Sequence, residues 1–227
     1  MKILAIETAT EACSAALSID GNIVERYELK PRQHSRLILA MMDSLLNEAG
    51  EDLQQLDALA FGCGPGSFTG LRIAAGVIQG AALGADLPVI PVSTLAALGQ
   101  DCLDRNDVNT VFTAIDARMG EVYWSVCNRN VQGLAEQIEP ETVTPVDRIE
   151  CADNACGIGI GSGWDTYQEK LTEKLGKRVS SVELGYFPRA AAVARLGLDG
   201  FDNGKAVPAE DALPVYLRNK VAKKKGE

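Results

Sequence analysis

Histidine is the scarcest chemically useful residue in this chain of 227 residues, which has only His34. Zinc sites of the His-Glu-x-x-His type, three-histidine metal sites and two-histidine iron sites need at least two imidazoles, so the sequence excludes them. A Ser-His-Asp or Cys-His device would have to use His34. The next residue, Ser35, does not face His34 on a helix. We therefore expect His34 to be exposed or to cap a helix.

Cysteine pairs and long apolar runs are also missing. The six cysteines include no CxxC spacing, so we expect reduced thiols and a cytoplasmic protein. Only four apolar residues separate Lys2 from Glu7, too few for a signal-peptide core. The stretch 61–85 carries Arg72 alone as a charge, but Gly, Ala and Pro65 interrupt it. We expect a buried loop and helix there and no contact with a membrane.

What is present fits an ordinary globular protein: 46% of the residues are hydrophobic and 23% are charged. The length favours two lobes. The net charge is −9, yet the segment 214–227 is basic and includes Lys223, Lys224 and Lys225. An acidic body lacks the clustered Lys and Arg that bind a phosphate polyanion. Any contact with nucleic acid would then depend on a partner or on this tail.

The first 105 residues predict a mixed α/β lobe. Alternating apolar residues predict strands at 2–8, 12–19 and 22–30, with a hairpin turn at Asp20-Gly21. Apolar residues at helical spacing predict a helix over 35–49 that ends at Gly50. The rest of the lobe is predicted to hold strands at 58–62 and 88–92 and helices at 68–84 and 94–103.

A second, more degenerate lobe is predicted over residues 106–213, since three strands recur at 110–115, 121–127 and 131–137. Residues 138–156 read as irregular. The run Gly157–Trp164 reads as a strand and a tight loop, and helices are predicted at 165–175 and 188–198. The repeated strand order indicates two related lobes.

The segment 62–72, GCGPGSFTGLR, follows a predicted strand and opens a helix, which is where backbone amides can collect an anion. It is not a Walker A motif, because Leu71-Arg72 stands in place of Lys-Ser/Thr. Ser67 replaces the last glycine of a dinucleotide fingerprint. The alternative is a turn in which Ser67 or Thr69 caps the helix.

Two helical faces are candidates for an interface. Gly76, Gly80 and Gly84 recur every four residues, so another backbone could approach closely there. Leu37 and Leu39 make the helix at 35–49 broader in apolar surface than one core stripe needs. Internal packing is the alternative. The predicted contact residues are Ile38, Met41, Met42, Leu45, Ile73, Gly76, Val77 and Gly80.

Two further segments are weak candidates for nucleotide binding. Glu7, Thr8 and Thr10 lie at a strand-turn-strand that could embrace a phosphate, but a single carboxylate does not make a metal site. Gly161 and Gly163 lie in the glycine-rich run, which is weak evidence by itself.

Several segments together resemble the bacterial TsaB (YeaZ) family: ILAIETATEACSAAL, the apolar helix after QHS, GPGSFTGLRIAAG, PVIPVSTLAAL and PVYLR. The resemblance implies two ribonuclease-H-like lobes of the actin, Hsp70 and sugar-kinase type. It also implies a part in making threonylcarbamoyladenosine beside the anticodon of tRNAs that read codons starting with A. The partners it implies are the catalytic paralogue TsaD and the ATPase TsaE, with tRNA reached through the complex. Alone, such a chain would form a homodimer.

Thr94 and Leu98 stand where the resemblance would place the paralogue's two metal-binding histidines. Leu98 has no donor atom, so we expect a non-catalytic, stabilising or activating subunit that needs no cofactor, with ATP or ADP a candidate ligand at the interface of the complex. One alternative is a small phosphotransferase or ATPase that uses Glu7, Thr8 and the run 157–163. A serine-type protease that uses Ser35 and His34 is another.

Overall fold

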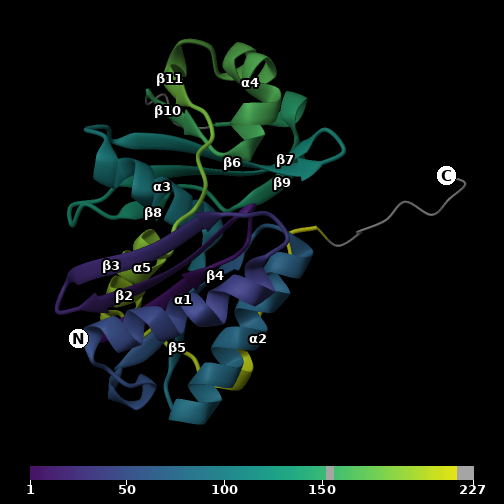
Figure 1. Cartoon of the computed structure of the whole chain (residues 1–227). Coiled ribbons are helices and arrows are strands. Elements are labelled where there is room, and N and C mark those ends of the chain that lie inside the picture. Colours follow the sequence, from purple (N-terminus) through teal and green to yellow (C-terminus); the bar gives the residue numbers. More distant parts are fainter. Residues whose placement is uncertain (152–155, 219–227) are drawn as a thin grey trace, which may run out of the picture.

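A computed structural model describes residues 1–151 and 156–218 as two lobes, each built on one mixed sheet (Figure 1). Most of the basic tail expected at 214–227 lies outside the described residues, since Lys223, Lys224 and Lys225 belong to 219–227. The strands of lobe I, in spatial order, are β3 (Asn22–Leu29), β2 (Ala12–Ile19), β1 (Lys2–Glu7), β4 (Ala58–Gly64) and β5 (Val89–Ser93).

Lobe II repeats the strand order of lobe I. Its path is β11 (Val179–Glu183), β10 (Gly157–Ile160), β6 (Thr110–Arg118), β7 (Glu121–Arg129) and β8 (Ala135–Gln137), and β9 (Thr142–Pro145) pairs with β7. In both lobes the first three strands form an antiparallel meander, and the last two add in parallel beside the first strand. The predicted recurrence of the three-strand meander is therefore confirmed, and the structure adds that the two further strands repeat as well.

In the part of the chain that the structure describes, five α-helices cover the sheets, and four short 3₁₀ turns join elements. The helices are α1 (His34–Ala49), α2 (Phe68–Ala85), α3 (Thr94–Arg105), α4 (Ser162–Leu175) and α5 (Ala190–Asp202), and the turns are η1 (Leu53–Gln55), η2 (Val146–Arg148), η3 (Gly176–Arg178) and η4 (Ala209–Asp211). Figure 1 shows α1 and α2 next to each other on one face of the lobe I sheet and α4 on lobe II.

Side-chain alternation along the strands of lobe I creates two cores. Leu4 and Ile6 of β1 face α1 and α2, whereas Ile3 and Ala5 face α5. The α5 face of the sheet is rich in alanine, and a Cβ on Gly197 would already lie 2.9 Å from the Cβ of Ala60. Small residues on both sides therefore let α5 pack closely on the sheet.

The lobes exchange their last helices. Helix α3 directly follows the last strand of lobe I but packs on β6, β7 and β8, while α5 follows lobe II but packs on β1, β2 and β4. The strands divide at the boundary expected near Asn106; the helices do not. Residues 190–212 therefore pack with lobe I, although the sequence analysis placed them in lobe II. Chain order does not reveal which sheet a helix will pack on.

Two strands and most helix ends differ from the sequence prediction. β9 lies in the stretch expected to be irregular, and β11 is a strand that the sequence analysis did not predict. Both are short, and no residue of β11 is fully buried, so neither carries a clear alternating pattern. Helix α4 starts at Ser162, earlier than predicted, because the run after β10 turns directly into the helix.

Helix α2 is less buried than the sequence suggested. Its 18 residues reach a mean hydropathy of 1.2, and 33% of them are buried. Among the described residues it is the single helix long and apolar enough to cross a membrane, yet its buried side packs on β4 and α1. The expectation of a buried helix is therefore corrected, since much of α2 faces outward.

The arrangement as a whole is the predicted fold class. Both lobes carry a five-stranded path in the order third, second, first, fourth and fifth strand, with helices on the faces. This is the duplicated, ribonuclease-H-like α/β fold shared by actin, Hsp70 and sugar kinases. Among its described residues, lobe II has β9 and η2 where lobe I has α1.

Candidate functional site

The glycine-rich segment 62–72 supports the β1–β2 turn through close backbone contacts. A Cβ on Gly66 would lie 2.6 Å from the carbonyl oxygen of Ala9, and one on Gly70 would lie 2.0 Å from that of Thr8. Ser67 N–H donates to Ala9 O at 2.7 Å, and Thr8 Oγ1 donates to Gly70 O at 2.8 Å. The Ser67 side chain caps α2, as the turn alternative predicted. These contacts favour the turn over an open anion cradle.

Glu7 lies at the end of β1 and is fully buried beneath this turn. Its Oε1 accepts from Ala9 N–H at 2.5 Å, and a Cβ on Gly62 would lie 1.9 Å from its Oε2. Neither Glu7 Oε2 nor the hydroxyl of Thr94 makes a well-formed hydrogen bond, although the Thr94 side chain is near enough to Glu7 to oppose part of the effect of burial on its pKa. Burial raises the pKa of Glu7 from 4.5 to about 7, so a large part of the folded protein keeps this carboxyl protonated at neutral pH.

An open cleft of about 1040 Å³ lies between the lobes. Thr10 from the β1–β2 turn lines it together with the first residues of α1 and α2 and with Asp116 and Ser162 from lobe II. Thr10 is 8% exposed, and its hydroxyl has no partner. Helix N-termini and a free hydroxyl are suited to an anionic group.

The cleft uses few of the residues predicted to bind a nucleotide. Thr10 lines it, but Glu7 and Thr8 are wholly buried and absent from its walls. A Cβ on Gly161 would lie 2.3 Å from Ala114 O, and one on Gly163 would lie 2.8 Å from Ala114 Cβ. The prediction for these four residues is corrected: the glycines let the start of α4 pack on β6, and the two polar side chains serve the turn.

His34 also differs from expectation. The ring is 7% exposed at the start of α1, and its Nε2 lies 3.1 Å from the carbonyl oxygen of Ala12, to which it donates. It therefore neither caps the helix nor projects into solvent, and Gln33 is the N-cap residue. His34 lines the cleft with Arg32, and the tertiary contact with β2 explains its burial.

Two positions on α3 are those that the family resemblance would align with the paralogue's metal-binding histidines. Thr94 and Leu98 are one turn apart, and both are fully buried. Leu98 packs toward Gly161, since a Cβ there would lie 2.8 Å from Leu98 Cδ2. Within residues 1–151 and 156–218, no three His, Cys, Asp or Glu side chains are arranged to hold a metal ion.

The predicted contact residues of α1 are core residues. Ile38, Met41, Met42 and Leu45 are between 0% and 8% exposed and belong to the cluster beneath α1 and α2. The prediction that they form an interface is corrected, because this stripe faces the chain's own sheet. Leu39, on the outer side of the helix, is 59% exposed.

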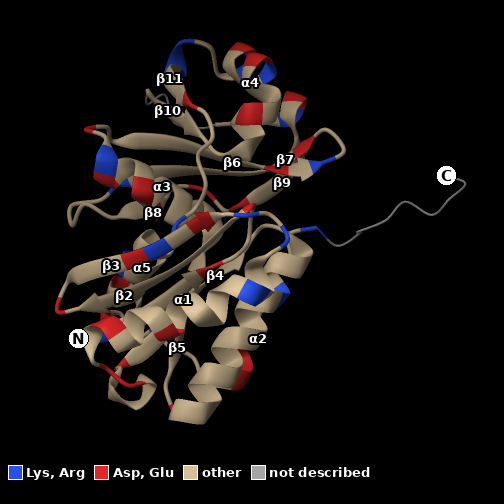
Figure 2. Ribbon diagram, in the orientation of Figure 1, with Lys and Arg blue, Asp and Glu red and all other residues tan. Residues whose placement is uncertain are grey.

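The outer side of α2 is an apolar surface that we call the glycine face, made of Ile73, Gly76, Val77, Gly80, Leu83 and Gly84. The three glycines are exposed or open, and a Cβ on any of them would meet nothing within 4 Å. Leu83 is 79% exposed, while Ile73 and Val77 are half-buried. Figure 2 shows the ribbon of α2 almost free of charge, since Arg72 is its single charged residue.

Three arginines around the cleft carried no signal in the sequence. Arg32, Arg118 and Arg218 line it, and the last comes from the segment after Pro214. Arg118 pairs with Asp116 at 3.0 Å, and Arg218 pairs with Glu121. The motif PVYLR indicated that this segment was distinctive, but its position across the cleft follows from tertiary structure alone.

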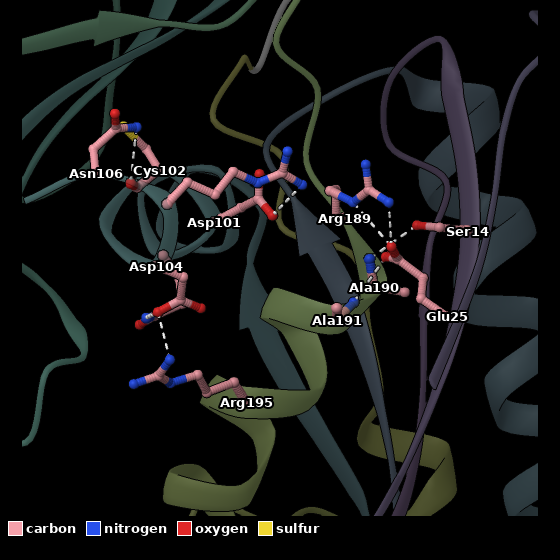
Figure 3. Close-up of polar contacts among 12 residues, drawn as sticks. Ser14, Glu25, Asp101, Cys102, Asp104, Asn106, Arg189, Ala190, Ala191 and Arg195 are labelled. Atoms are coloured by element: carbon pink, nitrogen blue, oxygen red, sulfur yellow. Dashed lines mark hydrogen bonds and ion pairs between the residues drawn. The ribbon is translucent and has the colours of Figure 1, made fainter. Parts of the chain in front are cut away.

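A polar junction joins the start of α5 to lobe I (Figure 3). Glu25 of β3 accepts from Arg189 Nε at 2.9 Å and from the backbone amide of Ala191 at 3.0 Å. Ser14 Oγ accepts from the amide of Ala190 at 2.9 Å. These side chains satisfy the free amides at the start of α5, which explains why this helix needs no local cap.

Three comparisons agree on the family. The sequence model described as "TsaD: tRNA N6-adenosine threonylcarbamoyltransferase" matches residues 25–175. The tRNA threonylcarbamoyladenosine biosynthesis protein TsaB of Escherichia coli (strain K12) is 43% identical, with 99% of this chain and 98% of the relative covered. The protein of the same description from Haemophilus influenzae is 40% identical, with 99% and 97% covered.

Solved structures give the same result. The structure described as YeaZ from Pseudomonas aeruginosa is 41% identical and has a TM-score of 0.88, with 95% of this chain and 99% of that chain covered. Because 95% of this chain is covered, the agreement extends over both lobes. This chain therefore belongs to the TsaB (YeaZ) family of tRNA threonylcarbamoyladenosine biosynthesis proteins.

Proposed function

We propose that this chain is a non-catalytic subunit of the complex that transfers a threonylcarbamoyl group to tRNA. In this proposal it stabilises or activates the paralogous transferase TsaD in the cytoplasm, and the adenosine modified is the one beside the anticodon of tRNAs that read codons starting with A. TsaE joins the complex, and tRNA contacts this chain only as part of it. The chain needs no cofactor of its own, and ATP or ADP would bind at the interface of the complex.

The glycine face of α2 is the observation that carries the proposal. An exposed helix with three open glycines and a strongly exposed leucine is a surface on which a second helix can pack at short interaxial distance. Apolar patches of this kind mark interaction sites in soluble proteins. We infer that the occupant is a helix of another protein.

The transferase is the favoured occupant because its family model covers residues 25–175, which include both α1 and α2. A protein of that family would carry the same two helices. Two related faces can then pair around an approximate twofold axis, and a second copy of this chain can occupy the face when the transferase is absent.

Light scattering after size exclusion tests the proposal, with this chain alone, with the transferase of the same organism, and with the Gly80→Leu variant. We expect a homodimer that exchanges into a heterodimer, and tRNA threonylcarbamoylation only when both proteins and TsaE are present. Gly80→Leu fills the face and should prevent both dimers.

Val131→Ala is the matched control, because Val131 is 97% exposed in the turn after β7, remote from the glycine face. It should pair as the wild type does. A Gly80→Leu chain that still forms the heterodimer, or a wild-type chain that modifies tRNA by itself, would overturn the proposal.

Nucleotide turnover by this chain is the second candidate function, supported by the cleft and the free hydroxyl of Thr10. This candidate predicts that the purified chain hydrolyses ATP in the presence of a metal ion and that Thr10→Val lowers the rate. Retention of the same rate by Thr10→Val would assign the activity to a contaminant, and no hydrolysis at all would remove this candidate.

A further inference from the structure

The last described residues, 213–218, run from lobe I to lobe II, and we call them the strap. They follow Ala212, which is fully buried against α2, and in Figure 1 the yellow C-terminal segment lies beside the end of α2 nearest lobe II. Val215 N–H donates to Cys63 O at 2.7 Å. A Cβ on Gly64 would lie 2.6 Å from Val215 O. The strap therefore depends on glycine at the end of β4.

The middle of the strap extends the glycine face. The rings of Tyr216 and Phe68 lie 5.4 Å apart, centroid to centroid, and the Arg72 guanidinium lies 3.9 Å above Phe68. Phe68 and Tyr216 are 43% and 42% exposed. Phe68, Arg72, Gly76 and Gly80 follow at four-residue intervals on one side of α2, so the aromatic pair lies at the end of the same stripe.

The end of the strap is held by lobe II. Arg218 pairs with Glu121 at the start of β7, and it also donates to Arg118 O at 3.5 Å. The Arg218 side chain is 17% exposed and the Glu121 side chain is 33% exposed. Val215, Tyr216 and Arg218 also line the cleft. Six residues thus connect the docking surface, the cleft and the β6–β7 turn.

We propose that the strap is part of the docking surface for the transferase and couples its occupancy to the cleft between the lobes. This inference rests on the function proposed above. Tyrosine and arginine at the rim of an apolar surface are residues that contribute strongly to protein association. A partner helix on the glycine face would cover Tyr216 and hold the strap, and Arg218 would then hold the β6–β7 turn.

Affinity for the transferase of the same organism tests the docking part. Tyr216→Ala should weaken binding at least tenfold, Tyr216→Phe should bind within about twofold of the wild type because the ring remains, and Val131→Ala should not change the affinity. Equal binding by Tyr216→Ala and the wild type, while Gly80→Leu prevents binding, would overturn the strap proposal alone. Normal binding by Gly80→Leu would instead overturn the proposed function.

Hydrogen exchange tests the coupling. Binding of the transferase should slow exchange at Val215 and at residues 118–121 at least tenfold. In Glu121→Ala the effect should persist at Val215 and disappear at 118–121, with the affinity for the transferase preserved within about threefold. If residues 118–121 of the wild type exchange equally fast with and without the transferase, the coupling does not exist.

Discussion

Glu7 is a carboxyl group buried inside lobe I. It is wholly buried, and neither its Oε2 nor the hydroxyl of Thr94, the first residue of α3, makes a well-formed hydrogen bond. The absence of a side chain at Gly62 is what gives it room. A carboxyl kept in such a place stabilises the fold chiefly in its protonated form.

Stability should therefore fall as the pH rises through the titration of Glu7. The pKa is 4.5 ordinarily and about 7 in the folded chain, so between these values the unfolded chain loses the proton first. The free energy of unfolding should drop by about 1.4 kcal/mol per pH unit, roughly 3 kcal/mol in total, relative to pH below 4.5. Urea unfolding from pH 4.5 to 8 measures this.

Glu7→Gln keeps the shape and removes the titration. Its stability relative to the wild type should increase from pH 4.5 to about pH 7 and stay constant above it. Glu169→Gln, at an exposed position of α4, is the control and should show no such trend. A constant difference between Glu7→Gln and the wild type at all pH values would refute the assignment.

At the scale of one element, α2 contains two kinds of glycine. Gly70 touches the β1–β2 turn, where a Cβ would lie 2.0 Å from Thr8 O, whereas a Cβ on Gly76 would meet nothing within 4 Å. Sequence alone does not separate them, because both occur in an apolar helical run. The first kind serves folding, and the second serves the proposed partner.

Alanine substitution should separate the two kinds. Gly76→Ala should raise the free energy of unfolding by about 0.5–1 kcal/mol, as alanine does inside a helix. Gly70→Ala should lower it by about 1–3 kcal/mol, because backbone must move. Thermal and urea unfolding measure both. Equal effects of the two variants would contradict the packing described here.

At the scale of the whole molecule, the exchange of α3 and α5 joins the lobes. Glu25 on the edge strand β3 binds Arg189 and the start of α5, and α5 also contacts α3 through the ion pair of Arg195 with Asp104 at 2.5 Å (Figure 3). A helix from one half of the sequence thus completes the core of the other half. The two lobes should unfold together.

Glu25→Ala should cost about 1–3 kcal/mol, since it leaves the Arg189 guanidinium and the Ala191 amide without their carboxylate. Glu48→Ala removes a surface ion pair between the Glu48 carboxylate, which is 59% exposed, and Arg26. This substitution should lower the free energy of unfolding by less than about 0.5 kcal/mol. Urea unfolding with probes in each lobe should show one shared transition. Separate transitions for the two lobes would disprove this coupling.

The sequence by itself determined the three-strand meander at the start of lobe I, its recurrence in lobe II, the main helices and the family. Alternation, helical spacing and the Asp20-Gly21 turn are local patterns, and the glycine-rich motif is specific enough to indicate relatives. Only the tertiary structure decided which face of each helix packs on the sheet and which face stays exposed. The α1 stripe and the glycine face are both apolar, and which of them the sheet covers depends on residues far away in the sequence.

The same limit applies to the site. Thr10, His34 and Arg218 come from three separate segments and meet at the cleft because the lobes pack as they do. Glycines at 161 and 163 resembled a loop for a ligand, and they proved to be contacts with β6. A local pattern can require a small residue at a position, but the atoms that approach it are supplied by the fold, so the reason for the glycine becomes visible only there.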